Sequence, residues 1–125
     1  MKIVIADDSF LLRDRIKFLL KSINNQSELY EAKNGLEAIH LILEVKPDLV
    51  ILDIRMPEMN GIDVLKKIRE SKMPVKICIL TNHSHQLYRL KCFEAGADYF
   101  LRKTEDFDDI NFIISDMLKG TVIPD

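Results

Sequence analysis

Cysteine is scarce in this sequence. The 125-residue chain has only two cysteines, Cys78 and Cys92, and neither stands in a C-x-x-C or C-x-x-H spacing. A disulfide framework or a zinc site needs paired or clustered cysteines. The sequence therefore predicts neither, and we expect both cysteines to pack as small apolar side chains.

Long hydrophobic runs are also missing. No apolar stretch approaches the roughly 20 residues that a membrane-spanning helix requires. At the N-terminus, the acidic pair Asp7 and Asp8 follows only a few apolar residues, so we expect no secretory signal peptide. We therefore expect a soluble, cytoplasmic protein that has no contact with a membrane.

An excess of positive charge is absent as well. The chain has 18 Lys and Arg against 20 Asp and Glu, a formal net charge of −2. Because nucleic-acid binding depends on a basic surface, we expect this domain to bind no nucleic acid. The length and the 47% hydrophobic fraction suit one globular domain. We assign it to residues 1–119, with 120–125 as a tail or the start of a linker.

Short apolar runs alternate with longer helical patterns along the chain. The runs predict five strands, at Ile3 to Ala6, Leu29 to Ala32, Leu49 to Leu52, Ile77 to Leu80 and Tyr99 to Leu101. Five helical patterns follow them; Ser9 suits the start of the first, Gly96 the end of the fourth, and the acids from Glu105 to Asp109 the start of the last. This alternation predicts a three-layer α/β/α fold around a five-stranded parallel sheet.

Polar residues stand just past the ends of four of the predicted strands. They are Asp7 and Asp8, Asp53, Thr81 and Lys103. In open parallel sheets, ligands bind beyond the carboxyl ends of the strands. We therefore expect these five side chains to gather at one edge of the sheet.

The five residue types together suit phosphoryl transfer. Three neighbouring carboxylates repel one another unless a cation joins them, and oxygen ligands suit Mg²⁺. Asp53 can act as a nucleophile toward phosphorus, as carboxylates do when aspartyl phosphates form. Lys103 and the metal would offset charge on the phosphoryl oxygens, and Thr81 could donate a hydrogen bond to one of them. Each residue alone would suit an ordinary structural role, so the prediction rests on all five together.

The motifs around these residues resemble the receiver domain of bacterial two-component response regulators, over essentially the whole chain. The matching stretches are IVIADDS (3–9), DLVILDIRMPEMNG (48–61), ILT (79–81) and EAGADYFLRK (94–103). The second is the most specific, because Pro57 and Gly61 follow Asp53 at +4 and +8. The resemblance implies the flavodoxin-like fold of the chemotaxis regulators, with strand order 2-1-3-4-5.

The resemblance also implies roles for single residues. Asp53 would be the phosphoacceptor, and Lys103 would pair with the phosphoryl group. Mg²⁺ would be bound by Asp8 and Asp53 directly, by Asp7 through a water molecule, and by the backbone carbonyl of Arg55.

A switch and a partner follow from the same resemblance. Thr81 would swing toward the phosphoryl group while Phe100, three residues before Lys103, turns inward; a plain core role for Phe100 is the alternative. The donor would be a histidine kinase or a phosphotransfer protein that docks near the first helix, beside the exposed Phe10 and Leu11. The basic residues of that helix, expected as a solvated face or as part of this docking surface, are Arg13, Arg15, Lys17 and Lys21. A homodimer on phosphorylation is a further expectation.

Some positions depart from the family pattern. Thr104 follows the lysine where many members have proline, and Asn82 stands where a very small residue is usual. Arg55 and His83, each two residues after a site residue, lie where the family tunes hydrolysis. We expect their large side chains to shield the phosphate from water and to slow its hydrolysis.

Two other functions remain open. A pseudo-receiver would bind partners without phosphorylation. An aspartate-nucleophile phosphatase would need a second acid two residues after Asp53, where Arg55 stands, so we expect no enzyme beyond the domain's own phosphorylation and dephosphorylation.

Overall fold

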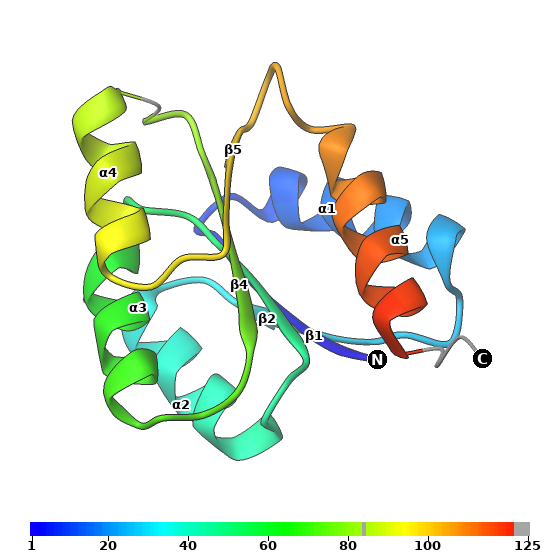
Figure 1. Cartoon of the computed structure of the whole chain (residues 1–125), viewed down its shortest axis with the longest axis horizontal. Helices are drawn as coiled ribbons and strands as arrows, with labels where there is room; N and C mark the ends of the chain where they lie inside the picture. Colours follow the sequence, from blue (N-terminus) through cyan, green and yellow to red (C-terminus); the bar gives the residue numbers. More distant parts are fainter. Residues whose placement is uncertain (84, 122–125) are drawn as a thin grey trace.

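The computed structural model describes residues 1–83 and 85–121, and in this part of the chain strands and helices alternate (Figure 1). The strands are β1 (Lys2–Ala6), β2 (Glu28–Ala32), β3 (Leu49–Leu52), β4 (Lys76–Thr81) and β5 (Tyr99–Arg102). The helices are α1 (Phe10–Ile23), α2 (Gly35–Val45), α3 (Gly61–Glu70), α4 (Gln86–Glu94) and α5 (Asp109–Thr121). All five predicted strands are found, each within about one residue of its predicted bounds. Residues 122–125 of the predicted tail lie outside the described residues, whereas 120 and 121 belong to α5.

The five strands form one parallel sheet in the order β2-β1-β3-β4-β5. Helices α1 and α5 cover one face, and α2, α3 and α4 cover the other (Figure 1). This confirms the predicted fold class and strand order. Among the described residues, no helix combines the length and the apolar character needed to cross a membrane.

Successive side chains of the central strands enter two separate cores, because neighbouring residues of a strand point to opposite faces. Val50 packs under α2 and α3, for example, whereas Ile51 packs under α1 and α5. All four residues of β3 are buried, which explains its unbroken apolar sequence. Cys78 and Cys92 are also buried, and burial raises the pKa of their thiols to about 12 and about 11. They pack as apolar side chains, as predicted.

Local signals fix the ends of two helices, the start of α1 next to Asp8 and the end of α4 before β5. Ser9 caps α1 by accepting a hydrogen bond from the Leu12 N–H at 3.3 Å. Helix α4 ends before Gly96, whose φ of 108° is readily adopted only by glycine.

The expectation that the acids from Glu105 onward begin the last helix is confirmed only for Asp109 and is wrong for the acids before it. Helix α5 starts at Asp109, and the residues from Lys103 to Asp108 form turns. Asp106 instead accepts hydrogen bonds from the backbone N–H and the guanidinium of Arg102, at 2.8 to 3.0 Å. Asp106 is therefore stabilised by Arg102 at the end of β5, and not by the N-terminus of α5.

Candidate functional site

Backbone hydrogen bonds continue past the carboxyl ends of the strands and hold the candidate residues in line. The Asp53 N–H donates to the Ala6 carbonyl at 3.0 Å, which ties the end of β3 to the end of β1. On the other side, the Lys103 N–H donates to the Thr81 carbonyl at 3.0 Å. The predicted gathering of the five residues at one edge of the sheet is therefore observed.

The ammonium group of Lys103 joins two buried carboxylates. Its Nζ lies 2.8 Å from Asp7 Oδ2 and 3.0 Å from Asp53 Oδ2, and its side chain is only 13% exposed. Burial alone would lower the pKa of Lys103, but the hydrogen bonds and charges of the two carboxylates outweigh burial and raise it. Lys103 is therefore a cation at neutral pH.

Three carboxylates form a group that suits a divalent cation. Asp7, Asp8 and Asp53 each offer an oxygen, and these atoms lie within 4.8 Å of one another. Asp7 and Asp53 are buried, whereas Asp8 faces solvent. Lys103 offsets one of the three negative charges, and the remaining two match the charge of Mg²⁺, which prefers such oxygen ligands. These three carboxylates fit the predicted Mg²⁺. Binding of the metal by the Arg55 carbonyl stays a prediction.

The two predicted switch residues lie on neighbouring strands. Thr81 is fully buried, and its Oγ1 accepts a hydrogen bond from the His83 N–H at 3.0 Å. Phe100 is 7% exposed and packs beside Phe93 of α4, with 6.5 Å between ring centroids. The Phe100 ring thus already lies in the core while the Thr81 hydroxyl is bound by its own loop. A switching role for this pair stays a prediction.

The departures from the family pattern lie around the entrance to the site. Asn82 is exposed and lines, with Thr104 and Lys103, a hollow that α1 borders. His83 turns its ring toward Tyr88, at a centroid distance of 6.3 Å. Arg55 is exposed beside Asp53. The roles of Arg55 and His83 in hydrolysis stay predictions.

Two glycines, Gly61 and Gly35, position the β3–α3 loop, and only Gly61 stands out in the sequence. A Cβ on Gly61 would lie 2.0 Å from the Asp53 carbonyl oxygen, and a Cβ on Gly35 would lie 1.8 Å from that of Met59. The N-terminus of α2 is therefore packed against the loop that follows Asp53. The sequence signal for Gly35 is weak, because a glycine can open a helix without any close contact to a distant segment.

The close approach of Gly61 to the Asp53 backbone predicts that replacing this glycine changes stability in the opposite direction to helix propensity. Propensity alone would favour alanine in α3. We expect Gly61→Ala instead to lower the free energy of unfolding by more than about 1 kcal/mol, because the new methyl group pushes on the Asp53 backbone. Urea unfolding measures this, with the exposed Lys67→Ala in the same helix as control. An unchanged or higher stability of Gly61→Ala would contradict the account.

The Arg102–Asp106 pair predicts a pH dependence. Hydrogen bonds from the Arg102 guanidinium and N–H lower the pKa of Asp106 to about 2, below the unfolded value of about 3.9. Its contribution to stability is therefore complete above pH 4 or so and is lost as the pH falls toward 2. Since the pair is partly exposed, we expect about 1 kcal/mol or less. The difference in unfolding free energy between wild type and Asp106→Asn should shrink over that range, and a constant difference would contradict the assignment.

Comparison with known proteins agrees with this geometry. The family model described as the response regulator receiver domain matches residues 3–115. The chain is 42% identical over 106 residues to YhcZ, an uncharacterized transcriptional regulatory protein of Bacillus subtilis, covering 84% of this chain and 50% of YhcZ. It is 36% identical over 110 residues to the sensory transduction protein LytT of the same organism, covering 88% and 45%. The chain spans about half the length of these curated relatives.

Solved structures give the same result. A DNA-binding response regulator of the LuxR family from Staphylococcus aureus is 32% identical with a TM-score of 0.85, over 92% of this chain and 96% of that one. The receiver domain of the response regulator NarL from Mycobacterium tuberculosis is 29% identical with a TM-score of 0.85, over 95% and 96%. Sequence, fold and site agree, and the chain belongs to the receiver-domain family of two-component response regulators.

Proposed function

We propose that this receiver domain accepts a phosphoryl group on Asp53 in an Mg²⁺-dependent reaction. The observation that carries the proposal is the meeting of three carboxylates with one buried ammonium at the carboxyl edge of the sheet. A static ion pair needs one carboxylate for one ammonium. The surplus of two negative charges suits a site that binds a divalent cation and an incoming phosphoryl group.

The residues divide the chemistry among themselves. Asp8 and Asp53, with the Arg55 carbonyl, would hold Mg²⁺, and Asp7 would hold one of its waters. The bound ion would supply charge neutralisation for the phosphoryl oxygens. A carboxylate oxygen of Asp53 attacks phosphorus, the bond from phosphorus to the donor nitrogen or oxygen breaks, and the donor leaves with that electron pair. Lys103, 3.0 Å from Asp53, is placed to pair with the transferred group.

The signal would leave the site through the β4–α4 loop. Once a phosphoryl oxygen is present, the Thr81 hydroxyl can donate to it, and a rotation of the Thr81 side chain toward that oxygen would break the bond from the His83 N–H. That loop leads directly into α4, which covers Phe100. The proposed movement therefore begins at Thr81 and His83 and reaches Phe100 through α4.

The donor we propose is a histidine kinase or a phosphotransfer protein that docks beside α1. Phe10 and Leu11 there are 63% and 80% exposed, next to the entrance of the site. The relative YhcZ is a transcriptional regulatory protein by name, so control of transcription is the output we favour. No acid stands at Arg55 to protonate a leaving group, so turnover of a separate substrate is not expected.

A mass measurement tests phosphoryl acceptance. Incubation with a small acyl phosphate and Mg²⁺ should add about 80 Da, the mass of one phosphoryl group, to the wild-type protein. Asp53→Asn should abolish this adduct because it removes the nucleophile, whereas Asp63→Asn, on the exposed first turn of α3, should retain it.

Absence of an adduct on the wild type would favour a pseudo-receiver. Rapid steady consumption of the acyl phosphate without an adduct would favour a phosphatase. An adduct that persists in Asp53→Asn would place the acceptor elsewhere.

A further inference from the structure

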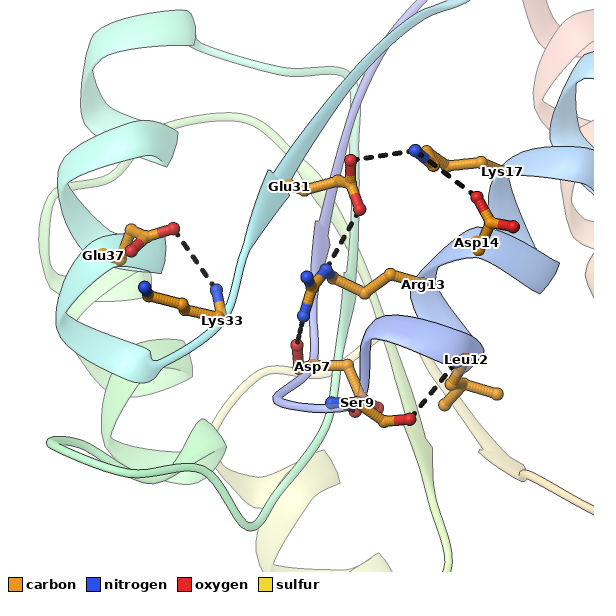
Figure 2. Close-up of polar contacts among 9 residues, drawn as sticks. All are labelled: Asp7, Ser9, Leu12, Arg13, Asp14, Lys17, Glu31, Lys33 and Glu37. Atoms are coloured by element: carbon orange, nitrogen blue, oxygen red, sulfur yellow. Dashed lines mark hydrogen bonds and ion pairs between the residues drawn. The ribbon is translucent and has the colours of Figure 1, made fainter.

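The side chain of Arg13 connects β2 to the backbone of the acid pair. Figure 2 shows its guanidinium group between Glu31 and Asp7. Nε donates to Glu31 Oε1 at 3.0 Å, and Nη1 donates to the Asp7 backbone carbonyl at 2.7 Å. Lys17 donates to the other oxygen of Glu31 at 3.0 Å. Arg13 and Lys17 are therefore engaged within the domain. The expectation of a solvated basic face is wrong for Arg13, whereas the Lys17 side chain is still 32% exposed.

The charges in this network are stable at neutral pH. Burial tends to raise the pKa of Glu31, but hydrogen bonds from Lys17 and Arg13 outweigh it and lower the pKa. The Arg13 side chain is only 12% exposed. A guanidinium is planar and presents its donors at fixed angles, so two bonds at different nitrogens fix its orientation.

The hydrogen bond from Arg13 holds the Asp7 carbonyl group, which the hydrogen bonds of the sheet do not hold. The Asp7 N–H belongs to the extended ladder, donating to Ala32 at 3.0 Å. Its carboxylate is bound by the Ser9 N–H and by Lys103, each at 2.8 Å. Its carbonyl belongs to the peptide plane shared with Asp8, because the peptide unit is planar. Arg13 therefore sets the direction in which the chain enters Asp8.

Asp8 depends on this constraint more than Asp7 does. The Asp8 side chain faces solvent, whereas Asp7 is fixed at its amide and at both carboxylate oxygens. Asp8 is also the residue proposed to contact Mg²⁺ directly. A tilt of the Asp7–Asp8 peptide would therefore move this ligand first.

We propose that the Glu31–Arg13 pair positions Asp8 for metal binding, Glu31 by orienting Arg13 and Arg13 by holding the Asp7 carbonyl. Both are positioning residues and neither contacts the metal or the phosphoryl group. The proposal rests on the proposed function, since it concerns the affinity of the same site for Mg²⁺.

Calorimetric titration with Mg²⁺ suits the test, because the chain has no tryptophan to report binding by fluorescence. Arg13→Gln should weaken Mg²⁺ binding about 10- to 100-fold, the usual effect of losing an outer-shell partner. The rate of phosphorylation by an acyl phosphate should recover as Mg²⁺ is raised to saturation. Lys17→Gln is the matched control, because it removes an ion pair to Glu31 but no contact with Asp7, and it should bind Mg²⁺ as the wild type does.

A charge swap separates positioning from stability. Arg13→Glu combined with Glu31→Arg keeps an ion pair between α1 and β2 but removes the donor to the Asp7 carbonyl. Relative to Arg13→Glu alone, the double variant should regain stability to urea while its Mg²⁺ affinity stays low. Recovery of both properties would overturn the proposal and leave the pair with a structural role.

The two proposals fail in different ways. A wild-type protein that neither binds Mg²⁺ nor takes up a phosphoryl group contradicts the proposed function. If the wild type does both and Arg13→Gln binds Mg²⁺ equally well, only the positioning role is overturned.

Discussion

The ammonium group of Lys103 keeps two buried carboxylates together at the carboxyl edge of the sheet. Without it, Asp7 and Asp53 would repel each other in surroundings that screen charge far less than water does. With it, the group of three acids retains two negative charges in place of three. Lys103 thus lowers the repulsion enough for the site to fold. The site keeps an excess of negative charge, and this excess allows it to bind a cation and, with that cation, a phosphoryl group.

The strand order makes this contact possible. Because β1 and β3 are neighbours, Asp7 and Asp53 emerge side by side, while Lys103 reaches them from the end of β5 with its long, flexible side chain. The strand between β3 and β5 ends at the small, buried Thr81. Connecting segments then refine the positions: Gly61 allows the chain after Asp53 to turn back closely, and the turn after Lys103 is fastened to β5 by its own ion pair.

The sequence predicts correctly the features that depend on local patterns of residues. Unbroken apolar runs mark the central strands, and the polar residues that follow the strands meet at one edge of the sheet. Its errors concern side-chain and backbone contacts that a periodic pattern does not show, two of them between distant segments and one between near neighbours. The partner of Arg13 is Glu31 on another element, so a helical pattern alone makes Arg13 look solvated. Asp106 looks like the start of a helix, although Arg102 offers it a stronger partner. Gly35 matters through a loop 24 residues away, at Met59.

The excess of negative charge around Lys103 should suit the transfer of a phosphoryl group to Asp53. A crystal structure with Mg²⁺ and trifluoroberyllate, a stable mimic of the phosphoryl group, tests it most directly. Beryllium should be bonded to Asp53, with Asp8 and Asp53 as ligands of the metal and the fluorines in contact with Lys103 and the Thr81 hydroxyl. Beryllium bonded to a different residue, or a metal that avoids the three acids, would contradict it.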